Sequence, residues 1–429
     1  MKTIIYPERN DWELLCKRPV INRSDLYDAV KAILQNVKLN GDFALYELEK
    51  KFDGAVLKNL KVSHAEIEGS AGRIPENLKK SINIAKTNIE KFHKSQLISE
   101  KPVETSPGVR CWRRNSPIEN VGLYIPGGTA PLFSTVLMLA IPAKIAGCKE
   151  IILCSPPDKS GNINPLILYT ASISGVRNIF KIGGAQAIGA MAYGTESIPK
   201  TYKVFGPGNQ FVTKAKEMVQ SEGVSIDMPA GPSEVLIIAD SSADPSFIAS
   251  DLLAQAEHGP DSQVVLVTND PEKIKKVKLE TNKQLKLLPR KEIASKALKN
   301  SLLILLNSIA ECVEFSNNYA PEHLIISTSE PRILAENVTN AGSVFIGQYS
   351  CESAGDYASG TNHTLPTNRF ARNFSGVSVD SFMRKITYQE ISPEGLKNLG
   401  CVIEQMAEAE SLTGHKNAVT IRLNSLKNA

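Results

Sequence analysis

Val121-Gly-Leu-Tyr-Ile125 is a short apolar run that leads directly into the turn Pro126-Gly-Gly-Thr-Ala-Pro131. A helix is expected over residues 134–146, followed by a second apolar strand, Glu150-Ile-Ile-Leu-Cys154. Two further strands, at residues 179–182 and 202–205, each run into another glycine-rich segment and then a helix. Strands that alternate with helices at this spacing predict an α/β fold built on a parallel sheet.

The glycine-rich segments lie where a parallel sheet binds ligands. They follow three successive strands, at residues 126–131, 183–189 and 206–209. Ligands of such sheets bind beyond the carboxyl ends of the strands, where glycine lets the backbone approach phosphate. None of the segments is the G-x-G-x-x-G fingerprint. They suggest nucleotide binding, with tight strand-to-helix turns as an equal alternative.

A second α/β unit begins at Val235-Leu-Ile-Ile238 and continues through strands at residues 263–268 and 301–307. In Tyr319-Ala-Pro-Glu-His323, a turn then enters another strand. Glu322 and His323 are adjacent groups able to exchange protons near neutral pH. Two polar surface residues at a strand entry are the alternative.

Residues 244–261 predict one short helix with marked ends. Asp244 and Pro245 suit its start, and Gly259 suits a left-handed C-cap. The spacing of Phe247, Ile248 and Leu252 predicts that they pack inward.

Another face of the same helix carries Asp251, Gln255 and His258. An amide oxygen and an imidazole that point the same way can form half of a metal site. A histidine that only complements the helix dipole is the alternative.

The two ends of the chain read differently. Residues 1–100 are expected to be mainly helical, with His64 and His93 on the surface. The stretch 347–374 predicts a long loop, of a length that is often functional. A helix is expected over 396–412, closed by Gly414-His415, with a short strand at 420–423.

Composition excludes several classes. At 429 residues the chain should hold two or three domains, and a net charge of +4 gives no case for nucleic-acid binding. The longest apolar run, near 136–146, is too short to span a bilayer, and no signal peptide is expected. Seven cysteines without a C-x-x-C pair argue against a disulfide framework. We therefore expect a cytoplasmic protein.

Taken together, the motifs resemble those of the histidinol dehydrogenase family, from about residue 20 onward. The motifs occur in order along the chain: Tyr124-Ile-Pro-Gly-Gly128, Gly183-Gly-Ala-Gln-Ala-Ile-Gly189, Phe205-Gly-Pro-Gly-Asn209, Asp227-Met-Pro-Ala-Gly-Pro-Ser-Glu234, Gln255-Ala-Glu-His258, Tyr319-Ala-Pro-Glu-His323, Gly355-Asp-Tyr-Ala-Ser-Gly360, Asn362-His-Thr-Leu-Pro-Thr367 and Gly414-His415. One departure is Thr361, where the family often has proline; it supplies no ligand.

The resemblance implies zinc-dependent oxidation of L-histidinol to L-histidine with two NAD, by a domain-swapped homodimer with one zinc per subunit. It implies two related, incomplete Rossmann-type domains of the aldehyde-dehydrogenase kind, with small helical extensions at both ends. The expected division is 1–22 as N-terminal extension, 23–119 plus 236–375 as catalytic and zinc domain, 120–235 as nucleotide domain, and 376–429 as dimerisation tail.

Residue roles follow from the same resemblance. His323 is the expected general base, and Glu322 the group that activates water. The expected zinc ligands are Gln255, His258, Asp356 and His415. The substrate is expected to contact these four ligands and also Ser233, His323 and Glu410. The expected NAD contacts are Tyr124, Gln186 and Asn209. A neighbouring loop residue, His363, either takes part or braces the metal loop.

Three alternatives stay open. A thiol of Cys111, Cys154 or Cys351 could attack an aldehyde, although no His or Lys adjoins any of them to lower its pKa. The same scaffold could oxidise another amino alcohol or a polyol. A zinc protein without redox chemistry would need no nucleotide turns.

Overall fold

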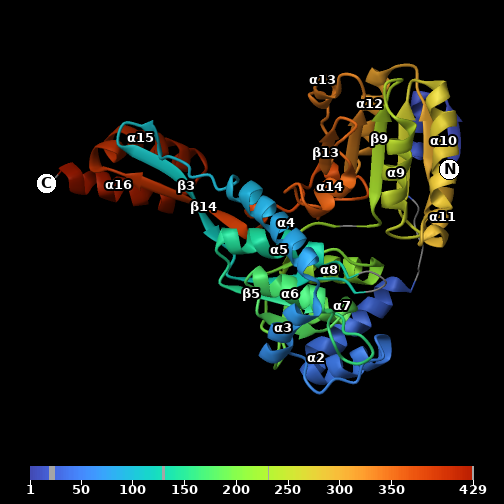
Figure 1. Cartoon of the computed structure of the whole chain (residues 1–429). Coiled ribbons are helices and arrows are strands. Elements are labelled where there is room, and N and C mark those ends of the chain that lie inside the picture. The colour runs from blue at the N-terminus through green and yellow to red at the C-terminus, as the bar shows by residue number, and fades with distance from the viewer. Residues whose placement is uncertain (19–24, 128–130, 230, 428–429) are drawn as a thin grey trace. The chain divides into compact units, whose positions relative to one another are not determined.

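The structure is a computed structural model that describes residues 1–18, 25–127, 131–229 and 231–427. The chain forms two compact units, called here the large unit (Met1–Gln96 with Ile118–Phe382) and the small unit (Leu97–Pro117 with Met383–Ala429). The large unit holds two parallel sheets, and the small unit holds an antiparallel one (Figure 1). Residues 128–130 of the first glycine-rich turn, Ala230, and residues 19–22 of the expected N-terminal extension lie outside the described residues.

One sheet of the large unit has five strands in the order β6-β5-β4-β7-β8, all parallel. In chain order this is 3-2-1-4-5, a Rossmann sheet without its sixth strand, as predicted. Its elements are β4 (Asn120–Tyr124), α5 (Phe133–Ala146), β5 (Glu150–Ser155), α6 (Pro165–Ile173), β6 (Asn178–Lys181), α7 (Gly184–Tyr193), β7 (Lys203–Phe205), α8 (Gln210–Ser221) and β8 (Ser225–Ile226).

The other sheet has six strands in the order β1-β11-β10-β9-β12-β13, again parallel. Without β1 its order is also 3-2-1-4-5. Every residue of β9 and β10 is buried, as a parallel sheet covered by helices requires. Its elements are β1 (Lys2–Ile5), β9 (Glu234–Ala239), α9 (Pro245–Ala256), β10 (Gln263–Thr268), α10 (Pro271–Leu285), α11 (Lys291–Lys299), β11 (Leu302–Leu305), α12 (Ile309–Tyr319), β12 (His323–Ser327), α13 (Pro331–Ala335), β13 (Ser343–Ile346) and α14 (Glu352–Tyr357).

The N-terminal region is helical as predicted, with one exception. Its helices are α1 (Trp12–Leu15), α2 (Leu26–Phe52), α3 (His64–Ser70) and α4 (Glu76–Lys94), but the chain starts with strand β1, paired with β11. The surface position predicted for His93 is wrong: the residue is fully buried, and its Nδ1 lies 2.8 Å from the Ile89 carbonyl oxygen. Its neighbours Ile82, Ala85 and Ile89 are also buried, so His93 lies on the apolar face of α4.

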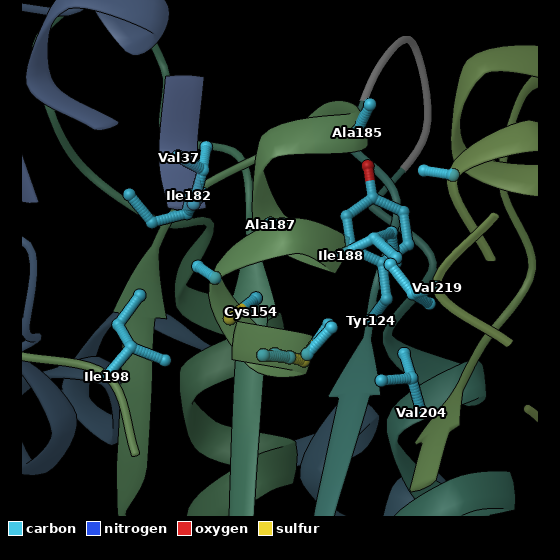
Figure 2. Packing of buried hydrophobic residues seen from close by; sticks show 14 of the residues in the cluster. Val37, Tyr124, Cys154, Ile182, Ala185, Ala187, Ile188, Ile198, Val204 and Val219 are labelled. Atoms are coloured by element: carbon cyan, nitrogen blue, oxygen red, sulfur yellow. The ribbon is translucent and has the colours of Figure 1, made fainter. Parts of the chain in front are cut away.

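Helix α2 packs against α7 of the five-stranded sheet. Val30, Leu34 and Val37 join Ile188 in one buried cluster, part of which is shown in Figure 2. This packing brings the last turn of α2 to the start of α7, where the Glu49 carboxylate accepts a hydrogen bond from the Gly183 N–H.

The small unit differs from the helical tail that the sequence predicted. Strand β14 (Met383–Ile391) pairs antiparallel with β3 (Val109–Pro117) over nine residues, and β2 (Val103–Ser106) pairs with β3. Helices α15 (Pro393–Ala409) and α16 (Thr413–Lys427) pack on each other. The strand predicted at 420–423 is therefore wrong, because Leu423 packs on Gly400 as part of a helix. No helix in the described ranges is long and apolar enough to cross a membrane.

Candidate functional site

Helix α9 starts as the sequence predicts. The Asp244 side chain accepts a hydrogen bond from the Ser246 N–H, and Pro245 is the first helical residue. Its end differs, because the chain leaves the helix at Glu257 in a right-handed conformation and Gly259 does not adopt a left-handed one. The C-cap prediction for Gly259 is therefore wrong.

The inward prediction is correct for two of the three apolar residues of α9. Ile248 and Leu252 are buried, whereas Phe247 is exposed, with its ring centroid 6.0 Å from that of Tyr349. A hydrophobic residue in the first turn of this short helix thus packs on a neighbouring loop rather than in the core.

Two segments bring candidate metal ligands together. His258 follows α9, while Glu352 and Asp356 lie four residues apart on one face of α14. One ligand atom from each lies within 4.8 Å of the others. The Gln255 side chain is buried, and its Oε1 has no hydrogen-bond partner in the described parts of the chain. An imidazole, two carboxylates and a free amide oxygen are a donor set that suits zinc.

Glu352 is a residue that the sequence reasoning missed. It is buried, and its Oε2 lacks a hydrogen-bond partner among the described residues. The signal was present in the spacing, because Glu352 and Asp356 are separated by one helical turn. It was overlooked because residues 347–374 were expected to be a loop, and α14 lies inside them.

Glu322 and His323 lie at the amino end of β12, both buried. The Glu234 backbone holds both: its N–H donates to Glu322 Oε2 at 2.8 Å, and its carbonyl lies 3.1 Å from His323 Nδ1. A carbonyl only accepts, so Nδ1 carries the proton and Nε2 is left with its lone pair. That Nε2 lies 3.6 Å from Asp356 Oδ1 and has no hydrogen-bond partner in the described residues.

Carboxylates dominate the electrostatics of this site. Burial lowers the pKa of His323, but the nearby charges of Glu352, Glu322 and Asp356 outweigh it and raise that pKa well above its usual value. Burial also raises the pKa of Glu322, and that of Glu352 strongly. Desolvation lowers the pKa of His258. Three carboxyl groups around two imidazoles leave a surplus of negative charge that a divalent cation would neutralise.

Further predicted residues lie around these groups. Ser233 directly precedes β9 and is partly buried. His363 Nδ1 lies 2.8 Å from the Asp356 carbonyl oxygen, and its Nε2 lies 3.1 Å from Thr135 Oγ1. This geometry matches a residue that braces the metal loop.

Two predicted residues belong to the small unit. Glu410 caps the C-terminus of α15, and His415 lies in the first turn of α16; both are exposed. Gly414 and His415 therefore begin a helix, instead of closing one as the sequence predicted.

The predicted cofactor residues lie at the carboxyl edge of the five-stranded sheet. Tyr124 ends β4, and its hydroxyl oxygen accepts a hydrogen bond from the Gly184 N–H at 3.0 Å; Figure 2 shows the hydroxyl directed toward the start of α7. Gln186 is buried and donates through Nε2 to Glu49 Oε1 at 2.8 Å. Asn209 is exposed, and its side-chain oxygen caps α8.

The turn after β7 permits this arrangement only because residue 206 is glycine. Gly206 has φ +126°, and a Cβ at this position would lie 2.1 Å from the Tyr124 carbonyl oxygen. A glycine-rich turn here thus brings two strand ends close together, at the point where the strand order of the sheet reverses.

Comparison with known proteins gives one consistent result. The sequence model of the family described as "Histidinol dehydrogenase" matches residues 16–423. The chain is 58% identical to the histidinol dehydrogenase of Bacteroides thetaiotaomicron over the full length of both, and 54% identical to that of Escherichia coli over 96% of this chain and 95% of the relative. Its structure superimposes on the crystal structure of histidinol dehydrogenase from Elizabethkingia anophelis with a TM-score of 0.98, at 56% identity, covering 100% of this chain and 99% of the other.

Proposed function

The chain belongs to the histidinol dehydrogenase family, and from this premise we propose that it oxidises L-histidinol, through L-histidinaldehyde, to L-histidine as the last step of histidine biosynthesis. Two NAD and one zinc ion per subunit would serve the reaction. We also propose that it acts in the cytoplasm, where its seven cysteines, all unpaired in the structure, would stay reduced.

One arrangement carries this proposal. His323 Nδ1 is held by the Glu234 carbonyl, and its unpartnered Nε2 points to the group that contains His258, Glu352 and Asp356. Where a bound cation neutralises the carboxylates that raise the pKa of His323, this buried imidazole with one free nitrogen can take a proton from an alcohol placed beside it. A metal bound next to it would hold that alcohol, so base and substrate would meet at fixed positions.

The two buried side chains divide the proton chemistry. His323 Nε2 would remove the hydroxyl proton of the alcohol and later that of the hydrated aldehyde. Glu322, whose pKa is raised by burial, is a stronger base than an exposed carboxylate and would take the proton of the water that hydrates the aldehyde. When bound, zinc would position the substrate and each NAD would accept one hydride. Overall, two hydrides leave the substrate and one water oxygen enters.

The remaining assignments are part of the same proposal. Gln255, His258, Asp356 and His415 are proposed as zinc ligands, with Ser233 and Glu410 also facing the substrate. The unpartnered Gln255 Oε1 supports the first of these. Tyr124, Gln186 and Asn209 are proposed to contact NAD, which assigns 120–235 to the cofactor and 23–119 plus 236–375 to catalysis. The segment 376–429 would serve a domain-swapped homodimer.

The swap has a direct test by subunit complementation. His258→Asn and His415→Asn should each abolish turnover. In a hybrid dimer of the two, a swapped tail leaves one of the two sites intact, so about half of the wild-type activity should return. A hybrid without activity would show that each His415 serves its own subunit.

The activity itself is tested by NADH formed per L-histidinol consumed, before and after metal chelation. We expect two NADH per substrate, loss of turnover on chelation, and recovery with zinc. One NADH per substrate would show that the reaction stops at the aldehyde. No NADH from L-histidinol with zinc-loaded protein would overturn the substrate, and other amino alcohols would be tested next.

A further inference from the structure

The five-stranded sheet lacks an acidic residue at the position where Rossmann sheets read the adenosine ribose. In those sheets, an Asp or Glu at the end of the second strand accepts hydrogen bonds from the ribose hydroxyls. Here the second strand, β5, ends at Ser155 and is followed by Pro156 and Pro157. The next residue, Asp158, is exposed, and its Oδ1 accepts hydrogen bonds from the Ser160 and Asn162 N–H groups of its own loop.

A carboxylate from outside the sheet occupies this edge instead. Asp53 is the C-cap of α2 and is partly buried. A Cβ built on Gly183, which follows the neighbouring strand β6, would lie 3.3 Å from Asp53 Oδ2 and 2.6 Å from Pro156 Cβ. A Cβ on Gly127 would lie 2.3 Å from Pro156 Cγ. Asp53 therefore lies where the ends of β4, β5 and β6 come together.

Glu49, one helical turn earlier, anchors the end of α2 at this edge. It is fully buried, and its Oε1 accepts hydrogen bonds from the Gly183 N–H at 3.0 Å and from Gln186 Nε2 at 2.8 Å. Burial raises the pKa of Glu49 to about 8, and it raises the pKa of Asp53 as well. Because Glu49 is bound to Gly183 and Gln186, the last turn of α2 holds Asp53 at this edge of the sheet.

We infer that Asp53, at the anchored end of α2, is the specificity-determining residue that binds the adenosine ribose hydroxyls of NAD and rejects the 2′-phosphate of NADP. The inference rests on the proposed function, because it assumes that the dinucleotide binds at this edge. A carboxylate offers two acceptors to adjacent hydroxyls, whereas a 2′-phosphate would bring like charge against it. Helix α2 would therefore supply a group that a Rossmann sheet ordinarily carries on its own second strand.

The test compares Asp53→Asn and Asp53→Ser with wild type, in turnover and in calorimetric binding of NAD and of NADP to the zinc-loaded protein. We expect the preference of kcat/KM for NAD over NADP to fall by about tenfold or more, which is the order of one hydrogen bond or one charge contact. The dissociation constants should shift in the same sense. The kcat for L-histidinol at saturating NAD should stay within about twofold of wild type.

Two controls separate this role from a general charge effect. Glu47→Gln removes an exposed carboxylate on the same helix, and Asp158→Asn removes the acid that follows β5. Neither should change the selectivity; a change with Asp158→Asn and none at Asp53 would overturn the inference. If wild type binds NAD and both Asp53 variants keep its selectivity, the inference fails while the proposed function stands. If wild type neither binds nor reduces NAD, the proposed function itself fails.

Discussion

Apart from β1, the two parallel sheets of the large unit share one strand order, but their proposed functional residues lie at opposite edges. In the five-stranded sheet the glycine turns, Tyr124 and Asn209 lie beyond the carboxyl ends of the strands. In the six-stranded sheet, Glu234 and His323 are the first residues of β9 and β12, so the proposed proton-transfer pair, Glu322 and His323, lies at the amino edge. Strand order alone therefore does not show at which edge of a sheet a functional site lies; the side chains at each edge must be considered.

The carboxyl edge of the six-stranded sheet is closed by its own hydrogen bonds. Asp240 follows β9 and accepts hydrogen bonds from the backbone and hydroxyl groups of both Ser242 and Ser329. The corresponding position in the five-stranded sheet is the tight approach of Gly206 to Tyr124. Polar groups that hydrogen-bond to one another close the carboxyl edge of the six-stranded sheet. At the carboxyl edge of the five-stranded sheet, glycines leave the backbone accessible to a ligand.

The largest effect is expected at the amino edge. His323→Gln removes the nitrogen proposed to take the proton, so kcat for L-histidinol should fall by about 10²–10⁴, the usual contribution of a general base. Steady-state kinetics measures it, with zinc content checked in the same sample. His64→Gln is the control, because His64 is an exposed histidine at the start of α3, and it should keep kcat. A His323 variant with near-normal kcat would show that His323 is not the general base of the reaction.

The second prediction concerns the residue that only the structure revealed. Glu352→Gln keeps the size of the side chain and removes its charge next to His258 and Asp356. Zinc affinity should fall by about 10–100-fold, as is typical when a group supporting a metal site is lost. Titration against a competing chelator measures it. Glu330→Gln, an exposed carboxylate on the loop before α13, is the control. Unchanged zinc affinity would mean that Glu352 contributes nothing to the metal group.

The sequence predicted the parts of this molecule that local pattern determines. Strands β9 and β10 are continuous apolar runs between helices, and both were predicted correctly. Strands β1 and β14 were missed because each depends on a partner far along the chain, Leu302–Leu305 and Val109–Pro117 respectively. A four-residue strand has no period long enough to distinguish it from a helix end.

The candidate site shows the same division. Motif resemblance pointed to Gln255, His258 and Asp356, and the structure brings His258 and Asp356 together. Glu352 could have been found from its one-turn spacing to Asp356 if residues 352–357 had been expected to be a helix, whereas the Glu49–Asp53 pair depends on α2 packing beside the five-stranded sheet. The expected domain boundaries stay predictions. The two compact units are defined by how the chain packs, and packing does not show which segment binds the cofactor or carries catalysis.

A smaller effect is expected at the carboxyl edge of the five-stranded sheet. Asn209 caps α8 through its side-chain oxygen, which leaves the amide NH₂ to meet a ligand. Asn209→Asp preserves the cap, because Asp and Asn are similar N-caps, and it replaces the donor with a negatively charged acceptor. KM for NAD should rise about 5–10-fold with kcat and melting temperature nearly unchanged, as for one lost hydrogen bond. Asn164→Asp at the start of α6 is the matched cap control. Equal KM values in both variants would contradict a cofactor role.

The smallest effect on turnover is expected at the closed edge, where stability should change instead. Asp240→Asn weakens the hydrogen bonds to Ser242 and Ser329 and should cost about 1–2 kcal/mol of unfolding free energy, with kcat and both KM values unaltered. Burial raises the pKa of Asp240, but these hydrogen bonds outweigh it and lower that pKa below its ordinary 3.8.

A lowered folded-state pKa means that the stabilisation is complete above pH 3.8 and disappears as pH falls through the folded value. The difference in melting temperature between wild type and Asp240→Asn should therefore be constant from pH 5 to 8 and shrink toward pH 3. Calorimetry across this range measures it. A loss of NAD or L-histidinol affinity in this variant would show that the six-stranded sheet uses both of its edges, and the contrast between the sheets would no longer hold.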